Sequence, residues 1–386
     1  MPQYRAPGVY VEEVGRPAPI GTMERSACAF LGPVHAAPAT GAAPVPLASF
    51  DEFARTWGGD ADLMFRAGPT PHYLAHAVRA YFAEGGSRLY VLPVAAARGN
   101  EGIPDAPAAS DYAQALAVAT LPDEVGVIAA PGASAWCADA AGVCRVLVEE
   151  AERAGARRFA VLDAPPGADP DAACALAAGI HSSRGALYYP WVQAAAEGPG
   201  VGRLLPPSGF VCAVYARTDR ERGVHKAPAN ALLASAVGLE REVASTLGDR
   251  LNAQGVNCLR QFPGRGVRVW GARTLSPDPE WKYVPVRRFV DQLETSIEHG
   301  LRWVAFERNG PELWARVRAA VEQFLVARWR EGALQGNKAE QAMFVRCDTS
   351  TMTGADIEGG RLVCEVGVAL VRPAEFLIFR CACRTA

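Results

Sequence analysis

The sequence lacks the features that mark a membrane-spanning or secreted protein. None of its apolar runs reaches the roughly 18 residues that a transmembrane helix needs. The first residues, Met1 to Arg5, contain no apolar secretion core, so we expect the protein to begin in the cytosol. The net charge of the 386 residues is only −2, which gives no electrostatic reason to expect nucleic acid or a membrane surface as a partner.

Catalytic motifs are scarce as well. Ser134 does not lie in a G-x-S-x-G turn, and Asp163 and His181 would form a triad only with a serine in such a turn, which the sequence does not offer. The glycine-rich segments 198–202 and 264–266 do not match the phosphate-binding pattern G-x-x-x-x-G-K-S/T and are more typical of turns. We therefore expect neither enzymatic activity nor a bound cofactor.

Metal-binding patterns are weak. His72 and His76 have the i, i+4 spacing of helical ligands, but no nearby Cys, Asp or Glu completes a site, which favours a surface or capping role. Cys381 and Cys383 form a single C-x-C pair, whereas a closed zinc site takes four ligands. Most of the ten cysteines lie in apolar stretches, as is typical of reduced thiols in a core. We predict no metal site.

Both ends of the chain carry strand-like sequences. Each is rich in β-branched or aromatic residues, and each is bounded by proline or by the end of the chain. The segments are Val9, Tyr10, Val11, Glu12, Glu13 and Val14, and Phe376, Leu377, Ile378, Phe379 and Arg380. A hinge is expected after the first, at Gly15, Pro17, Pro19 and Gly21. Such ends predict a subunit that adds strands to the sheets of its neighbours. The second segment is the less certain donor, since it could pair with the strand before it.

The sequence between these ends changes character near residues 220–230. From Ser110 to Trp191, strand and helix patterns alternate, which predicts an α/β layer with a largely parallel sheet. Beyond residue 223 the patterns predict an α+β region with helices over 288–306 and 311–329 and strands near 343–347 and 362–371. We therefore expect an arm and hinge over 1–24, an α/β domain over 25–222, and an α+β domain over 223–386.

The second long helix is densely charged. Arg316, Arg318, Glu322 and Arg328 all lie on it, opposite an apolar stripe. A solvated helix face has this pattern, and so does a surface that is complementary to a charged partner. The sequence leaves both interpretations open.

Several motifs resemble those of contractile tail sheath proteins, the family found in myophages, pyocin-like bacteriocins and extracellular contractile injection systems. The motifs cover both ends and most of the second half of the chain. They are Pro7–Glu13, Leu187–Trp191, Pro206–Gly209, Tyr215–Asp219, Gly223–Asn230, Leu251–Asn257, Gly271–Leu275, Trp281–Arg287 and Trp329–Leu334. One departure is His225, at a position where relatives usually have Trp.

The resemblance implies a structural function. Sheath subunits form six-fold rings that stack around an inner tube on a baseplate, and their terminal arms weave a shared β-sheet. It implies an outer α/β domain, an inner α+β domain and no catalytic site. It suggests that Arg316, Arg318, Glu322 and Arg328 face the tube. The expected partners are further copies of the chain, the tube, the baseplate and a terminator or cap. Assembly would take place in the bacterial cytoplasm, as part of a phage tail or of a cytoplasmic or released particle.

Two alternatives stay open at this point. One is a specialised sheath copy next to the baseplate or cap, which would carry the same motifs. The other is an α/β hydrolase-like enzyme, which would need a pocket with converging polar groups.

Overall fold

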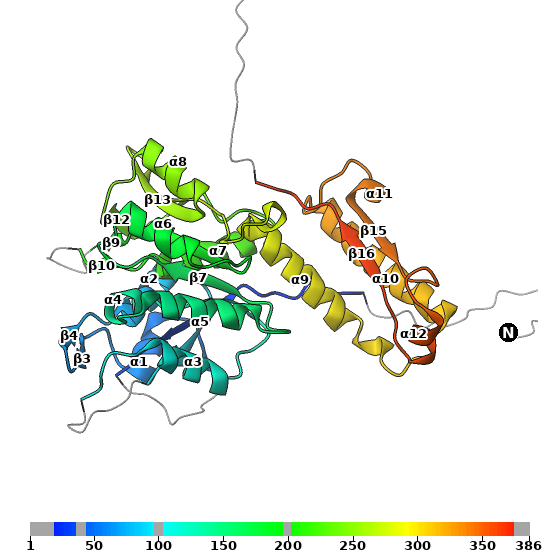
Figure 1. Cartoon of the computed structure of the whole chain (residues 1–386), viewed down its shortest axis with the longest axis horizontal. Coiled ribbons are helices and arrows are strands. Elements are labelled where there is room, and N and C mark those ends of the chain that lie inside the picture. Colours follow the sequence, from blue (N-terminus) through cyan, green and yellow to red (C-terminus); the bar gives the residue numbers. More distant parts are fainter. Residues whose placement is uncertain (1–18, 36–43, 96–102, 196–201, 374–386) are drawn as a thin grey trace, which may run out of the picture. The chain divides into compact units, whose positions relative to one another are not determined.

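The computed structural model describes residues 19–35, 44–95, 103–195 and 202–373 (Figure 1). The internal contacts divide the chain into two units. We call residues 23–295 the large unit, to which 371–373 also belong, and residues 19–22 with 296–370 the small unit. No helix in the described ranges is both long enough and apolar enough to cross a membrane.

A nine-stranded mixed sheet forms the centre of the large unit, in the order β11-β14-β13-β8-β7-β6-β1-β5-β2. Six neighbouring strands are parallel: β1 Ala27–Gly32, β5 Leu89–Pro93, β6 Val125–Ala129, β7 Phe159–Asp163, β8 Gly185–Tyr189 and β13 Val256–Phe262. Antiparallel strands flank them: β2 Pro46–Leu47 at one edge, and β14 Gly266–Trp270 with β11 Ala231–Leu232 at the other. Every residue of β1, β6, β7 and β8 is buried, which explains why these strands read as continuous apolar runs.

Helices cover both faces of this sheet, so the large unit has three layers. Two apolar cores separate the layers. One face carries α1 Phe50–Trp57, α2 Tyr73–Ala83 and α7 Ser208–Arg222, and the other carries α3 Ala109–Val118, α5 Ala140–Glu152, α6 Pro170–Ala178 and α8 Ser245–Ala253. Side-chain caps fix several helix starts: Ser49, Asp139 and Asp169 each accept a hydrogen bond from a backbone N–H of the first turn.

Short elements complete the large unit. They are the helix α4 Ala133–Trp136, the 3₁₀ turn η1 Pro279–Trp281, the hairpin β3 Leu63–Phe65 with β4 Gly68–Thr70, and a three-stranded antiparallel sheet of β9 Val192–Ala194, β10 Leu204–Leu205 and β12 Ala236–Leu239. The helix α9 Val284–Gly300 begins in the large unit and ends in the small one.

The small unit is built on one long helix and a two-stranded antiparallel sheet. Its elements are the 3₁₀ turn η2 Arg302–Val304, the helices α10 Pro311–Arg330, α11 Ala339–Ala342 and α12 Gly354–Glu358, and the strands β15 Met343–Arg346 and β16 Glu365–Val368. Leu313, Trp314, Val317, Cys347 and Met352 form its buried core. A two-stranded sheet is marginal alone, so packing on α10 stabilises it.

The alternation of strands and helices predicted for residues 110–191 is confirmed, and the apolar run 159–163 within it forms β7. Two helices differ from their sequence patterns. The pattern over 240–252 predicts a helix, but α8 starts only at Ser245 because Ala236–Leu239 forms β12. The helix expected over 288–306 ends early, because α9 stops at Gly300. The division between the units also falls later than the expected 220–230. The reason is β13, whose pairing with β8 keeps the chain after residue 223 in the large sheet.

Candidate functional site

The crevice where an α/β sheet usually binds a ligand is filled in this protein. It lies beyond the carboxyl ends of β1 and β6, because β2 and β5, which follow β1 in the sequence, lie on one side of β1, and the later strands β6 to β8 lie on the other. The Tyr73 ring stacks against Trp136 there at 5.6 Å and meets Trp191 edge-on at 5.2 Å. A Cβ at Gly132 would lie only 2.3 Å from Tyr73. No room for a substrate is left at this point.

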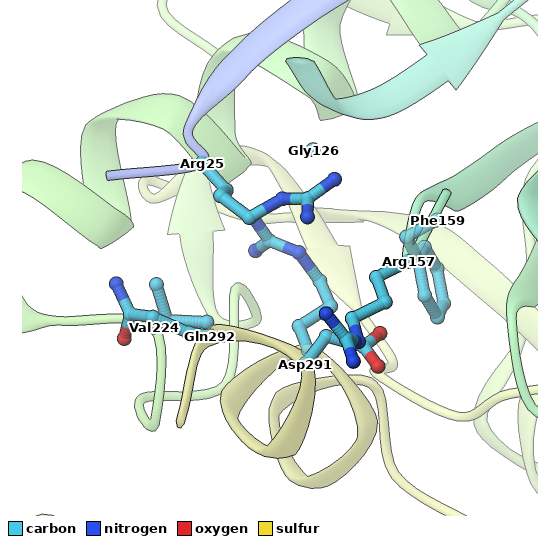
Figure 2. A pocket seen from close by; sticks show the side chains of 8 residues that line it. Arg25, Gly126, Arg157, Phe159, Val224, Asp291 and Gln292 are labelled. Carbon is cyan, nitrogen blue, oxygen red and sulfur yellow. The ribbon is translucent and has the colours of Figure 1, made fainter. Parts of the chain in front are cut away.

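Two further cavities in the described part of the large unit are water-sized. One is lined by residues that include Arg25, Arg157, Phe159 and Asp291, and it has a volume of about 10 Å³. Figure 2 shows these side chains gathered around it. A second, beside Ser134 and Asp163, has the same volume. Each has room for one water molecule, whereas ligand sites measure roughly 300–1,000 Å³.

The residues considered for a catalytic triad serve the fold. Asp163 is buried and accepts hydrogen bonds from the Ser208 backbone N–H at 2.7 Å and from its Oγ at 2.6 Å, which caps α7. Burial raises the pKa of Asp163 to about 7, although both hydrogen bonds from Ser208 oppose this shift. Ser134 faces the Ala164 carbonyl at 3.4 Å, and His181 is exposed. These contacts bring no serine and histidine together.

The histidine pair shows no metal-site geometry. His72 is completely buried, not exposed, and its ring nitrogens face the carbonyl oxygens of Gly59 and Pro33 at 3.1 and 3.0 Å. Burial lowers the pKa of His76 to about 4. Across the described ranges, no group of three or more potential metal ligands occurs. Gly264 and Gly266 have positive φ angles in the β13–β14 turn, which confirms the turn prediction for that segment.

Buried ion pairs attach the first part of α9 to the large unit. Arg288 donates two hydrogen bonds to the Asp219 carboxylate, at 3.0 and 2.5 Å, and both side chains are about 95% buried. Burial disfavours the charge on Arg288, but Asp219 more than offsets this effect, so the pKa of Arg288 is raised. Asp291 in turn accepts from Arg184 at 2.6 Å and Arg287 at 2.7 Å. Removing one member of such a buried pair typically costs about 3–5 kcal/mol, so this end of α9 is firmly held.

The chain that enters β1 is attached to the same helix. Arg25 donates to Thr295 Oγ1 at 3.1 Å and to the Ala156 carbonyl at 2.6 Å, and Gln292 Nε2 donates to the Met23 carbonyl at 3.3 Å. Burial, followed by the charge of Arg158, lowers the pKa of Arg25 to about 10. The chain passes from one unit to the other between residues 22 and 23 and again between residues 295 and 296. These bonds therefore join residues 23–25 to residues 292–295, where both segments leave the large unit.

The expected hinge is described only at Pro19 and Gly21. Both residues are exposed, and a Cβ at Gly21 would meet nothing within 4 Å. Ile20 between them is buried in the small unit, where a Cβ at Gly300 would lie 2.7 Å from its side chain. Gly15, Pro17 and the two predicted arm segments, 9–14 and 376–380, lie outside the described residues.

Helix α10 places its apolar stripe in the core of the small unit and its charges outside. Leu313, Val317, Val321, Phe324 and Leu325 are buried, as predicted. Its charged residues, Glu312, Arg316, Arg318, Glu322, Arg328 and Arg330, sum to +4 − 2 = +2. The helix surface is therefore weakly positive, in a chain whose net charge is −2.

The four predicted partner-facing residues of α10 differ in exposure. Arg318 and Glu322 are 44% and 50% exposed and lie 4.0 Å apart, and Arg316 is 36% exposed, 3.7 Å from Glu307 and over the Trp303 ring. Such surface pairs contribute only about 0–1 kcal/mol, so a partner can displace them at little cost. Arg328 is only 20% exposed, pairs with Glu331 at 2.6 Å and covers Phe324, which indicates a more structural role.

The β15–β16 sheet has open edges. Its register runs from Met343 opposite Val368 to Arg346 opposite Glu365. Beyond the end of β16, the Gln335 N–H donates to the Ala369 carbonyl at 2.8 Å, but along 365–368 no strand of the described chain pairs with the outer edge of β16. Unpaired backbone groups of this kind are a template for strand addition.

The small unit's charged helix and its open sheet edge are features of a structural subunit that assembles with neighbours. Residues 105–275 match the family model described as phage tail sheath protein central domain, and residues 276–384 match the phage tail sheath C-terminal domain. The chain therefore belongs to the phage tail sheath protein family, whose members are structural and not enzymatic. It is a contractile tail sheath subunit of phage-like or injection-system particles.

Individual relatives agree with this assignment. A putative prophage major tail sheath protein of Pseudomonas aeruginosa (strain UCBPP-PA14) is 28% identical over 229 residues, which span 58% of this chain and 57% of that protein. A chain of the anti-feeding prophage baseplate is 31% identical, with a TM-score of 0.74 over 99% of this chain and all of that chain. A chain of the contracted PVC sheath complex, an extracellular contractile injection system, is 29% identical, with a TM-score of 0.76 over 99% and 98%.

Two features of the structure bear on these motifs. His225, the departure from the family motif, keeps an aromatic contact, since its ring meets Phe289 edge-on with centroids 5.9 Å apart. The ionic contacts that hold α9 were not anticipated. The sequence does contain a signal for these ion pairs, which is a charged residue close to a buried apolar segment. Asp219, for example, follows the apolar first part of α7.

Proposed function

We propose that this chain is the repeating subunit of a contractile sheath that polymerises as stacked six-fold rings around an inner tube. Contraction of the sheath would drive the tube through a target envelope. The observation that carries the proposal is the full-length likeness to a subunit of a contracted sheath complex. The anti-feeding prophage baseplate, which also contains a similar chain, is described as six-fold symmetrised, in keeping with six-fold rings here.

Strand addition at the small unit would link the subunits. Segment 9–14 would leave its own subunit and pair with the open edge of β16 in a neighbour, and segment 376–380 would extend the same mesh. One hydrogen bond contributes roughly 0.5–1.5 kcal/mol, so a single pairing is weak. Tethering through folded units raises the effective concentration of each arm, so a lattice of such links is strong.

The two units would have separate roles in the particle. The small unit, with the arms, would form the inner layer and present Arg316, Arg318 and Glu322 to the tube, and the large unit would form the outer layer. In this proposal the inner layer would comprise residues 296–370 of the small unit, rather than the whole of 223–386 expected from the sequence. Contraction requires that the same subunit packs in two different ways. Because buried ion pairs attach the first part of α9 to the large unit, the large unit would move as one body.

A second candidate function is a specialised sheath copy next to the baseplate. The similarity to a baseplate chain supports it about as well as the similarity to a sheath chain supports the main proposal. In either case the partners would be further copies of the chain, the tube, the baseplate and a terminator or cap. The particle would be assembled in the bacterial cytoplasm, as a phage tail or as a cytoplasmic or released injection device.

Negative-stain electron microscopy of the purified protein tests the proposal. We expect hollow, regularly striated tubes with six-fold end views, in the relaxed, contracted form that free subunits would adopt. Single rings that do not stack would favour the baseplate-proximal copy. Uniform small particles at all protein concentrations would overturn both candidates.

A further inference from the structure

Two cysteines of the small unit face each other across the β15–β16 sheet. Cys347 follows β15 directly and is 1% exposed, and Cys364 precedes β16 directly and packs against the same core. Because Arg346 is opposite Glu365, the next position in the register places Cys347 opposite Cys364. Both side chains pack against the same core, so they lie on one face of the sheet, and each thiol affects the pKa of the other.

The hydrogen-bond pattern identifies the type of this cross-strand pair. The Ala369 N–H donates to the Ala342 carbonyl at 2.8 Å, so Ala342 and Ala369 form a hydrogen-bonded pair. Hydrogen-bonded and non-hydrogen-bonded pairs alternate along an antiparallel ladder. Cys347 and Cys364 are an odd number of positions away from the Ala342–Ala369 pair, so they form a non-hydrogen-bonded pair. In such pairs the Cα atoms lie about 4.5 Å apart. Disulfides span Cα separations of about 4.4–6.8 Å, so the backbone need not move.

We propose that Cys347 and Cys364 form an intramolecular disulfide when the protein meets an oxidising environment. With a disulfide such as oxidised glutathione as oxidant, one cysteine thiolate attacks a glutathione sulfur and releases the first reduced glutathione. The second cysteine thiolate then attacks the mixed disulfide and releases the other. Two protein thiols are oxidised, one glutathione disulfide is reduced, and the two thiol protons pass to the glutathione thiolates.

The surroundings of the pair set when this reaction happens. Burial raises the pKa of Cys347, and burial together with Cys347 raises the pKa of Cys364 to about 12, so little thiolate is present at neutral pH. Oxidation is therefore slow, and reducing cytosol keeps both thiols free during assembly. Only a particle that stays outside the cell would be oxidised, and this last point rests on the proposed function.

The disulfide would fasten the part of the small unit that is otherwise weakly held. It closes the connection 348–363, which contains α12, and joins the two strands at the end away from α11. Constraining a loop of this size restricts the unfolded chain and stabilises the fold. The sheet proposed to receive the arms would then resist opening after release.

Mass spectrometry of the purified full-length protein tests the inference directly. The protein is incubated with oxidised glutathione at about pH 8, unfolded in N-ethylmaleimide and digested with trypsin without reduction. Cleavage after Arg346 and Arg361 separates the two cysteines, so the disulfide links peptide 347–361 to peptide 362–380. We expect the linked species, two hydrogens lighter than the sum of the peptides, to form over hours and to vanish with dithiothreitol.

A control pair tests selectivity within the same sample. Cys28 and Cys212 are also neighbours, with Cys28 Sγ 3.7 Å from the Cys212 carbonyl, but both are fully buried in the large unit. We expect them to stay reduced and alkylated. The inference is overturned if Cys347 and Cys364 carry separate labels after prolonged oxidation, or if Cys28 and Cys212 cross-link equally.

Thermal unfolding gives a second readout that depends on the disulfide. We expect oxidation to raise the apparent melting temperature of the wild type by several degrees, and to leave that of Cys364→Ser unchanged. An equal shift in both proteins contradicts the inference. Neither measurement needs a polymer, so failure of the disulfide is distinguishable from failure of the sheath proposal, which microscopy decides.

Discussion

Asp163 is a buried residue whose ionisation affects the stability of this fold. Its pKa is about 7 in the folded protein, against an ordinary value of 3.8, because the carboxyl group is buried. Between about pH 4 and pH 7 the folded state therefore binds more protons than the unfolded state, and stability falls as the pH rises through this window. A shift of this size corresponds to at most about 4 kcal/mol.

We expect Asp163→Asn to flatten this pH dependence. The amide oxygen of Asn can still accept from Ser208, and Asn does not ionise, so the variant should lose less stability than the wild type between pH 5 and pH 7.5. Urea unfolding followed by circular dichroism at both pH values measures the difference. Asp169→Asn is the matched control, because Asp169 also accepts a backbone N–H at a helix start but is exposed. Equal pH profiles for the wild type and Asp163→Asn would refute the prediction.

At the scale of single residues, the sequence predicted local contacts and not distant ones. Ser49 and Glu52 have the S-x-x-E spacing of a helix capping box, and Ser49 accepts from the Glu52 N–H at 3.3 Å, because both residues lie in one helical turn. Asp163 and Ser208, or Asp219 and Arg288, meet only after a sheet and several helices have formed. No spacing in the sequence encodes such a pair, so Asp163 was considered only as a catalytic candidate.

Among the secondary-structure elements, α10 carries the clearest prediction about partners. We expect Arg316→Glu with Arg318→Glu to weaken assembly of extended sheath on a tube, because two reversals change the α10 charge from +2 to −2. Arg328 is left unchanged, since reversing a side chain that covers Phe324 would also disturb the fold. Both altered residues are at least 36% exposed, so folding stability should change by no more than about 1 kcal/mol.

Electron microscopy of sheath and tube produced together measures this effect, as the ratio of tube-filled extended particles to empty contracted ones. The matched control is Arg145→Glu with Arg250→Glu in the large unit, where both residues are about half exposed and ion-paired. We expect at least a tenfold loss of extended particles for the α10 variant only. Normal extended particles from that variant would count against a tube-facing α10.

Elements with strong local signals were predicted well, and those that depend on tertiary pairing were not. The continuous apolar runs 27–34 and 159–163 each predict a strand, and they form β1 and β7. The apolar stripe over 311–329 likewise predicts the helix α10. The end of α9 was misplaced because apolar residues 301 and 304 extend the helical pattern into what is a 3₁₀ turn. β13 was overlooked, and its parallel pairing with β8 is what moves the boundary between the units to residue 295.

For the whole molecule, the central prediction is that polymerisation depends on the N-terminal arm. Deleting residues 1–14 should leave a folded monomer, because the described fold holds both its cores and the contacts of Ile20 and Arg25 without that segment. The open edge of β16 should then receive no strand, and each missing link weakens every ring in the stack. Analytical ultracentrifugation and negative-stain microscopy of the truncated protein measure the outcome.

The matched control separates loss of strand pairing from loss of chain length. A full-length variant with Val9→Pro and Val11→Pro keeps the arm but removes backbone donors and extended pairing, and should fail to polymerise like the deletion. A variant with Val9→Thr and Val11→Thr keeps strand propensity and should still form tubes. If regular tubes form from the truncated protein, the subunits must be joined by surfaces of the folded units, and an arm-based mesh cannot be what holds the sheath together.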